Sequence, residues 1–157
     1  MKKLNEDIIA FFQRQPFVII SSIDKKGYPH NACKGIVDID KSGRIYLLDL
    51  YKARTYENIK SNPQISITAV DEHKFIGYCL KGRADIIKEK QMSPWLIELW
   101  EKRITKRISH RLLKNLQGQK GHASHPEALL PRPAYLIEVE VQEVTDLSPF
   151  NKSISLA

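Results

Sequence analysis

The sequence is poor in cysteine, in long apolar stretches and in internal repeats. Only two cysteines occur among its 157 residues, and they form no CxxC pair, which excludes a disulfide framework and a cysteine-based zinc site. This usage predicts a protein of the reducing cytoplasm. No apolar run is long enough to predict a membrane span or a secretory signal. A single compact domain over 1–157 is therefore expected, because this length can bury a core without covalent staples.

The net charge of +7 is concentrated in one segment. Six cations and no acid lie between Lys102 and Lys114, so this segment accounts for all but one unit of the net charge. A basic segment can attract nucleic acid, but this one has no recognition motif and no aromatic ladder on which bases could stack. The sequence therefore argues against nucleic acid, and favours a solvated helix face or a set of cations that attracts an anionic substrate.

Short β-rich runs separated by turn residues dominate residues 16–88. Apolar and polar residues alternate in "QISITAV", and again over 134–146. The turns "DKKG" and "DKSG" both end in glycine, as hairpin turns often do. We therefore predict five strands within 16–88 and a sixth over 134–146, mostly paired in sequential antiparallel order. This pattern favours a mainly β fold, a six-stranded antiparallel barrel with inserted helices.

Three helices are expected around these strands. Residues 1–15 form an amphipathic pattern, and a short helix is predicted over 53–61 after the third strand. A long, basic amphipathic helix is predicted over 93–116 after the fifth strand, where Ser93 and Pro94 form a start signal.

The short helix begins with cations at the end that favours negative charge. Lys52 and Arg54 stand there beside Thr55, where a helix carries a partial positive charge. A phosphate held by free N–H groups, a hydroxyl and an arginine fork would make this arrangement favourable. Alternatively, both long side chains extend into water and Glu57 offsets their charge. The local pattern leaves both readings open.

Three motifs in a fixed order carry a resemblance to a known family. They are a G-x-P link between two strands at Gly27, the "KART" helix that ends in "NP", and the strand end "KGRA". With these motifs, residues 10–88 resemble the pyridoxamine 5'-phosphate oxidase-like family of FMN-binding split barrels. The resemblance implies a six-stranded antiparallel split barrel of the FMN-binding type. It also implies a homodimer with the FMN cofactor at the interface between the two copies.

The resemblance further implies which residues bind FMN. Arg54 would hold the phosphate. Thr55 and Ala53 stand where relatives often have a second cation and a serine, and Lys52 lies beside them. Lys34 would reach the phosphate from the second strand. The residues implied at the flavin edge are Cys33, Gly35, Leu48 and Asp49.

Several departures separate the chain from the vitamin B6 oxidases. Ala32 stands where those enzymes have a phosphate-binding arginine, Gly77 replaces a polar residue that contacts the flavin, and the C-terminus lacks their Trp- and Arg-bearing ending. The chain therefore resembles a smaller relative, a group that includes flavin reductases, deazaflavin-dependent reductases and haem-handling proteins. We expect an FMN-dependent oxidoreductase of unknown substrate. The alternatives are a haem or deazaflavin binder, or a nucleic-acid binder that uses the basic helix.

The remaining candidate groups favour no further chemistry. His122 and His125 are three residues apart and His110 lies upstream, but no third ligand has metal-site spacing, so no metal site is expected. Asp49 could act as a general base and Cys33 as a redox thiol. Neither has a partner that can be identified from sequence, which favours structural roles for both, and no catalytic residue is assigned.

Overall fold

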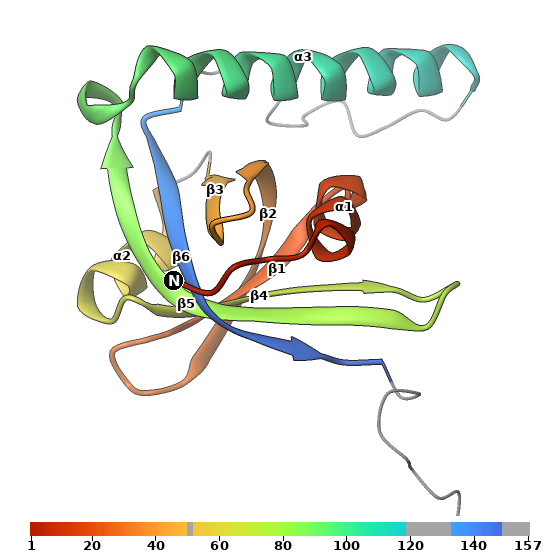
Figure 1. The fold of residues 1–157 in the computed structure, drawn as a ribbon. Coiled ribbons are helices and arrows are strands. Elements are labelled where there is room, and N and C mark those ends of the chain that lie inside the picture. The colour runs from red at the N-terminus through yellow and green to blue at the C-terminus, as the bar shows by residue number, and fades with distance from the viewer. Residues whose placement is uncertain (50–51, 119–132, 149–157) are drawn as a thin grey trace, which may run out of the picture.

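A closed β-barrel forms the centre of the computed structural model, which describes residues 1–49, 52–118 and 133–148 (Figure 1). In chain order, its elements are α1 (Glu6–Arg14), β1 (Val18–Ile23), β2 (Pro29–Ile39), β3 (Arg44–Leu48), α2 (Arg54–Ser61), β4 (Gln64–Asp71), β5 (Ile76–Lys88), the 3-10 helix η1 (Glu89–Gln91), α3 (Pro94–Leu116) and β6 (Tyr135–Asp146). The barrel order is β1-β2-β3-β6-β5-β4, with antiparallel pairing throughout. The predicted six-stranded antiparallel barrel with inserted helices is confirmed.

Two turns with glycine at positive φ connect the first three strands. In the β1–β2 turn, Gly27 has a φ of 85°, and Asp24 Oδ1 accepts hydrogen bonds from two backbone N–H groups of the turn. In the β2–β3 turn, Gly43 has a φ of 90°, and a Cβ there would collide with the backbone carbonyl oxygen of Lys2. Glycine is therefore required at residue 43 for its conformation and for the close approach of the N-terminal segment.

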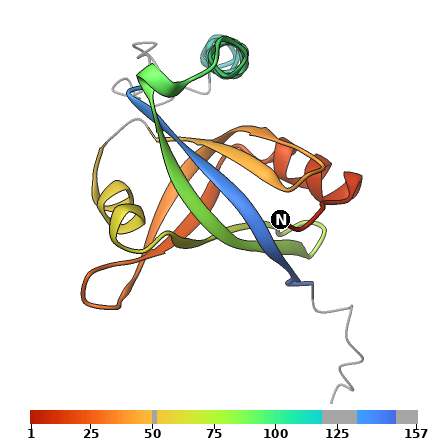
Figure 2. The same cartoon turned by 60° about the vertical axis from the view of Figure 1, so that its left-hand side comes forward.

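Inward-facing strand residues and two helices form the barrel core. The fully buried strand residues include Ile20, Ile45, Leu47, Ile67, Leu80, Ile137, Val139 and Val141. Helix α1 adds Phe11 and Phe12 to this core, and α2 adds Tyr56 and Ile59. Figures 1 and 2 show α1 and α2 on opposite sides of the barrel. Each buried large apolar side chain contributes about 1.5–3 kcal/mol of transfer free energy, so both helices are held firmly.

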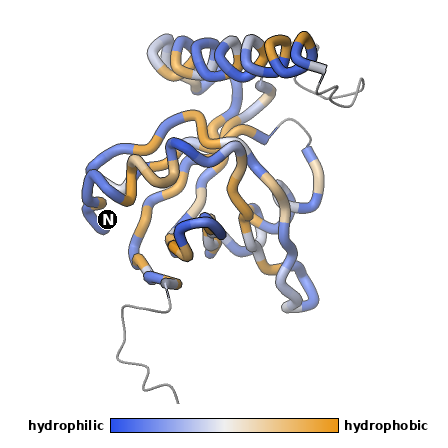
Figure 3. The backbone as a smooth tube through the Cα atoms, turned by 90° about the vertical axis from the view of Figure 1, so that its right-hand side faces the viewer, coloured by the Kyte–Doolittle hydropathy of each residue, from blue (hydrophilic) through white to orange (hydrophobic). Residues whose placement is uncertain are grey.

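Helix α3 lies across an outer face of the barrel and packs on it mainly through its first half (Figure 1). The buried residues of this second apolar cluster are Val37, Tyr46, Leu48, Met92, Leu96, Trp100, Ile104 and Leu136. Leu112 and Leu116 continue the apolar spacing, but they are 59% and 85% exposed. Figure 3 shows hydrophilic and hydrophobic residues interspersed along the whole helix. In the described parts of the chain, no helix has the length and apolarity needed to cross a membrane.

Candidate cofactor-binding site

The start of α2 presents exposed cations beside a helix end without a side-chain cap. Lys52, Ala53 and Arg54 are exposed. Ala53 occupies the N-cap position and makes no side-chain hydrogen bond to the first turn. Residues at this position usually supply an oxygen that accepts a hydrogen bond from a first-turn N–H group, and alanine has none to supply. This helix end therefore suits an anion that accepts from the backbone and pairs with Arg54.

Lys52 has an aromatic neighbour that helps to explain its position. Its Nζ lies 4.7 Å from the ring centroid of Tyr56, and the Nζ of Lys60 lies 5.7 Å from the same centroid. The Tyr56 ring in turn meets the Tyr135 ring edge to face, with centroids 4.9 Å apart. Cations over an aromatic face are stabilised by the ring quadrupole. Lys52 therefore has a structural contact of its own, in addition to any role toward an anion.

A cavity lies beside this aromatic pair. Its volume is about 380 Å³, which falls within the range of small-molecule sites. The residues that line it are Lys52, Tyr56, Lys88, Glu89, Lys90, Gln91, Ala134 and Tyr135. Three lysines and one carboxylate among these described residues make its wall cationic, which again favours a negatively charged occupant.

A polar network next to the cavity joins the middle of β2 to the end of β3 and the start of β6. Lys34 Nζ donates to Asp49 Oδ1 at 2.5 Å, and the Tyr135 hydroxyl donates to Asp49 Oδ2 at 2.5 Å. The Asp49 and Lys34 side chains are only 2% and 11% exposed. Burial raises the pKa of Tyr135 above its usual range, and the hydrogen bond to Asp49 and the charge of that carboxylate raise the pKa further. We call these residues the Lys34–Asp49–Tyr135 network.

Strand register explains why the network forms. Gly35 pairs with Leu48, and Leu48 pairs with Leu136, across β2, β3 and β6. Lys34, Asp49 and Tyr135 each adjoin one of these paired residues in sequence, so their side chains point to the opposite face from those of the paired residues, toward the barrel interior. The three polar groups therefore meet at one end of the barrel, although they are far apart in the sequence.

The network changes the interpretation of two predicted site residues. Lys34, predicted to reach a phosphate, has its ammonium group bonded to a buried carboxylate instead. Asp49, for which no partner could be identified from the sequence, has both Lys34 and Tyr135. Thr55 is also turned inward, with 2% of its surface exposed. Of the residues predicted at the phosphate, Arg54, Ala53 and Lys52 are the exposed ones.

The residues predicted at the flavin edge lie in different environments. Cys33 is exposed on the outer face of β2, where it pairs with Ile19 of β1. Gly35 faces α3, and a Cβ at that position would lie 3.1 Å from Arg107 Nη1. Leu48 is buried in the apolar cluster beneath α3. Only Cys33 among these three presents an exposed side chain to a ligand on the outer face.

Sequence reasoning missed the aromatic half of this site. Tyr56 and Tyr135 were not identified as functional residues, although the alternation over 134–146 placed Tyr135 on the buried face of its strand. His110 lies on α3 within the described part of the chain, whereas His122 and His125 lie outside the described residues.

Comparison with known proteins identifies the family. Residues 4–147 match the family described as pyridoxamine 5'-phosphate oxidase. The chain belongs to this family. The predicted resemblance is confirmed, and the match extends well past the segment that first suggested it. This family member is not a true pyridoxamine 5'-phosphate oxidase, as the expected departures at Ala32, Gly77 and the C-terminus imply.

Solved structures of similar fold cover nearly the whole chain. HupZ from Group A Streptococcus is 18% identical with a TM-score of 0.64, and the match covers 93% of this chain and 96% of that one. An F420 reductase is 15% identical with a TM-score of 0.58, covering 90% and 98%. The haem storage protein HutZ from Vibrio cholerae is 18% identical with a TM-score of 0.53, covering 92% and 94%. At these identities the likeness supports the fold alone. No curated protein matches the sequence.

Proposed function

We propose that this family member binds FMN and acts as a flavin-dependent oxidoreductase on a substrate not yet identified. The proposal rests mainly on the start of α2, where the exposed Arg54 adjoins a helix end whose N-cap residue offers no side-chain acceptor. A phosphate monoester fits this position, because it accepts from backbone N–H groups and from the guanidinium fork. Membership of the family makes the FMN phosphate the favoured anion.

Some of the residues predicted to bind FMN are placed to contact it directly, and others are not. Arg54 is suited to hold the phosphate, with Lys52 adding positive charge from the adjoining loop. Cys33 lies exposed on the outer face of β2, where the edge of the isoalloxazine ring would meet strand backbone. The ammonium group of Lys34 is bonded to Asp49, so Lys34 would affect the cofactor only through the Lys34–Asp49–Tyr135 network. When bound, the flavin supplies the electron transfer, and the protein supplies binding and orientation.

The proposal includes a homodimer with the cofactor at the interface between the two copies. An uncharged surface on β1, β2 and β4 supports it. Neighbouring outward-facing residues on these strands are Ile19, Ser21, Asn31, Cys33, Ser66 and Thr68. Charged residues make up 27% of the chain, so a charge-free area spanning three strands suits contact with a second copy. The free cysteines fit the proposed cytoplasmic location, since that compartment keeps thiols reduced.

Other cofactors define the alternatives. An F420 reductase and the haem storage protein HutZ have similar folds, so this barrel could also carry a deazaflavin or haem. The visible spectrum of the purified protein, followed by mass spectrometry of the released molecule, distinguishes these cofactors. Flavin absorbance bands are expected. A Soret band, or a colourless protein that fails to bind added FMN, would overturn the FMN proposal.

The phosphate contact is tested by Arg54→Ala, with Lys60→Ala as the matched control on the same helix. Loss of a charge-assisted hydrogen bond should weaken FMN binding by roughly 1.5–3 kcal/mol. Lys60 lies in the last turn of α2, and although its Nζ reaches the Tyr56 ring, it does not adjoin the free N–H groups of the first turn, so its replacement should weaken FMN binding less than that of Arg54. Titration of apoprotein with FMN, followed by flavin fluorescence, measures both effects. Equal affinities for the two variants would place the phosphate elsewhere.

A further inference from the structure

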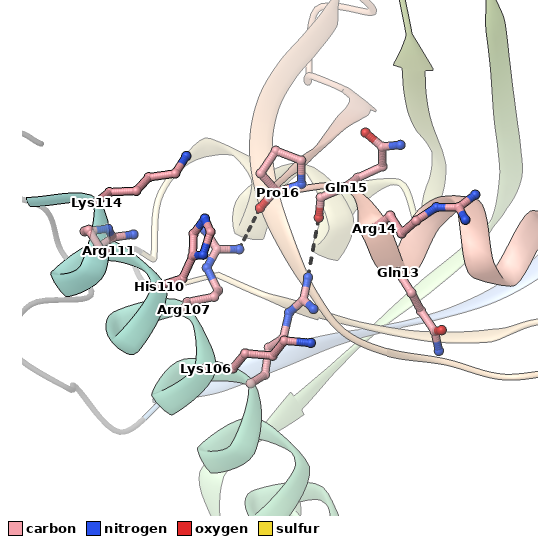
Figure 4. Close-up of a pocket in the computed structure, with 10 residues that line it drawn as sticks. Gln13, Arg14, Gln15, Pro16, Lys106, Arg107, His110, Arg111 and Lys114 are labelled. Carbon is pink, nitrogen blue, oxygen red and sulfur yellow. Dashed lines mark hydrogen bonds between the residues drawn. The ribbon is translucent and has the colours of Figure 1, made fainter. Parts of the chain in front are cut away.

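A second cationic cavity lies between the end of α1 and the second half of α3, and we call it the basic cleft (Figure 4). Its volume is about 440 Å³. The described residues that line it are Gln13, Arg14, Gln15, Pro16, Arg103, Lys106, Arg107, His110, Arg111 and Lys114. Six of these carry a cationic side chain and none carries a carboxylate. Figures 1 and 2 place the α1 side of the barrel opposite α2, so the basic cleft lies away from the position proposed for the FMN phosphate, although its wall residue Arg107 adjoins Gly35, which is predicted at the flavin edge.

Two arginines of α3 connect the two walls of the basic cleft by hydrogen bonds. Arg107 Nη1 donates to the carbonyl oxygen of Pro16 at 2.7 Å, and Arg103 Nη2 donates to that of Gln15 at 3.4 Å. Both bonds appear as dashed lines in Figure 4. They fix α3 against the junction between α1 and β1, next to the apolar packing of Ile104 and Ile108. Both arginines are therefore wall residues, and the exposed cations of the described lining are Arg14, Lys106 and Lys114.

Lys106 and Lys114 of α3 make no hydrogen bond or ion pair within the described part of the chain. Both lysines are exposed and lie on the same side of the helix, Lys106 three residues after Arg103 and Lys114 three residues after Arg111. Like charges at this spacing destabilise a helix by a few tenths of a kcal/mol per pair. The first half of α3 instead pairs Lys102 with Glu98 at 2.7 Å. Positive charge therefore accumulates in the second half, where repulsion between neighbouring cations offsets the favourable interaction of Lys114 with the C-terminal end of the helix dipole.

We propose that the basic cleft binds a compact polyphosphate, either inorganic or carried by a nucleotide. Arginine forks and lysine ammonium groups bind phosphate oxygens by charge-assisted hydrogen bonds. From Lys106 to Lys114 the helix rises about 12 Å, a length that suits two or three linked phosphates. The cleft has walls on two sides and the volume of a small-molecule site. The described lining contains no aromatic residue on which nucleic-acid bases could stack.

The test is calorimetric titration of the purified full-length protein with sodium tripolyphosphate and, separately, with ATP. The double variant Lys106→Gln, Lys114→Gln should bind tripolyphosphate roughly tenfold or more weakly than the wild type, because two charge-assisted contacts are lost. Lys102→Gln is the matched control, since it removes one cation from the same helix outside the cleft lining. This control and Arg54→Ala should both retain wild-type affinity for tripolyphosphate. Tighter binding of ATP than of tripolyphosphate would identify a nucleotide as the source of the phosphates.

Three outcomes would overturn the proposal. The first is tripolyphosphate binding no tighter than that of sulfate at matched ionic strength. The second is equal affinity for tripolyphosphate in the wild type and the double variant, with unchanged circular dichroism. The third is binding of duplex DNA that is tighter than that of either phosphate compound and is lost in the double variant, which would make the cleft part of a nucleic-acid surface. Because Arg54 is unchanged in the double variant, FMN binding should persist, so this proposal and the FMN proposal can fail separately.

Discussion

The Lys34–Asp49–Tyr135 network and the basic cleft both bring charged side chains together, but in opposite ways. In the network, a lysine and a tyrosine share one carboxylate, Asp49 and Tyr135 are buried, and the Lys34 side chain is only 11% exposed. In the basic cleft, six cations gather among exposed and half-buried residues, and the described lining holds no acid. The charged groups of the network are thus paired with one another, whereas the described lining of the cleft has an excess of positive charge.

This difference separates a structural role from a binding role. Buried charges are costly unless each has a partner, so a paired network is expected to support the fold or be lost with it. Exposed like charges repel one another and contribute little to stability, so their accumulation is better explained by an external anion. The three predictions that follow test this contrast through the free energy of unfolding.

The largest effect is expected for Asp49→Ala. This substitution removes the carboxylate to which the Lys34 ammonium group and the Tyr135 hydroxyl both donate. Breaking a buried ion pair by removing one partner costs about 3–5 kcal/mol of the free energy of unfolding. Urea denaturation monitored by circular dichroism measures the loss. Glu143→Ala is the control, since it breaks an exposed pair with Lys81 at 2.8 Å and should leave stability nearly unchanged.

A double variant sharpens this prediction. Lys34→Met combined with Asp49→Leu removes both charges, so it should lose less stability than Asp49→Ala alone. A double variant as unstable as the single one would show that Asp49 acts through packing or through its other contacts. In that case the charge pair would not be the reason for the loss.

A smaller effect is expected for Tyr135→Phe. One hydrogen bond to a buried carboxylate is removed and the ring remains, so the free energy of unfolding should fall by about 1–3 kcal/mol. The pKa of Tyr135 is raised above its ordinary value of 10.0, first by burial and then by Asp49. Its contribution to stability is therefore fully present below pH 10 and is lost as the pH rises through its folded-state pKa, where the phenol of the native protein ionises.

Absorbance titration of tyrosinate provides an independent measure for the same variant. Because the pKa of Tyr135 is raised above its ordinary value of 10.0, its phenol should not ionise near pH 10, and wild type and Tyr135→Phe should show the same absorbance increase around that pH while both remain folded. A smaller increase in the variant would mean that Tyr135 titrates as an ordinary tyrosine, contrary to its place in the network.

The smallest effect is expected for the double variant Lys106→Gln, Lys114→Gln. Removing two exposed like charges relieves repulsion along α3, but it also removes the last-turn cation Lys114 from the C-terminal end of the helix dipole, so the free energy of unfolding should change by less than about 0.5 kcal/mol. Thermal unfolding at low and high salt measures this change, and the difference between variant and wild type should shrink at high salt. A marked loss of stability would instead assign these lysines to the fold, as for Lys34.

Much of the fold could be predicted because the signals are local. Helix α3 begins at Pro94, and the Ser93 side chain accepts a hydrogen bond from the backbone N–H of Leu96, as the start signal predicts. The strand runs follow from alternation of neighbouring residues, and glycine at residues 27 and 43 marks the tight turns. Each of these signals depends on residues only a few positions apart.

The candidate site could be predicted only in part. The motif around Arg54 identified an exposed cation at the start of a helix, and the structure has it there. The partner of Lys34 could not be inferred, because Asp49 lies 15 positions away and the pairing depends on how β2 and β3 align. The bulge between Ile36 and Asp38 shifts that alignment, and the sequence pattern does not locate it.

By itself, the sequence determined the strand and helix order, the barrel architecture and the family. These properties follow from residue periodicity, turn chemistry and short motifs, all of which are local. Only the tertiary structure decided that Tyr135 meets Asp49 across 86 positions, and that Gln15 and Pro16 bond to the arginines of α3. The physical reason is that barrel closure and helix docking bring together residues whose separation in the chain carries no signal of their contact.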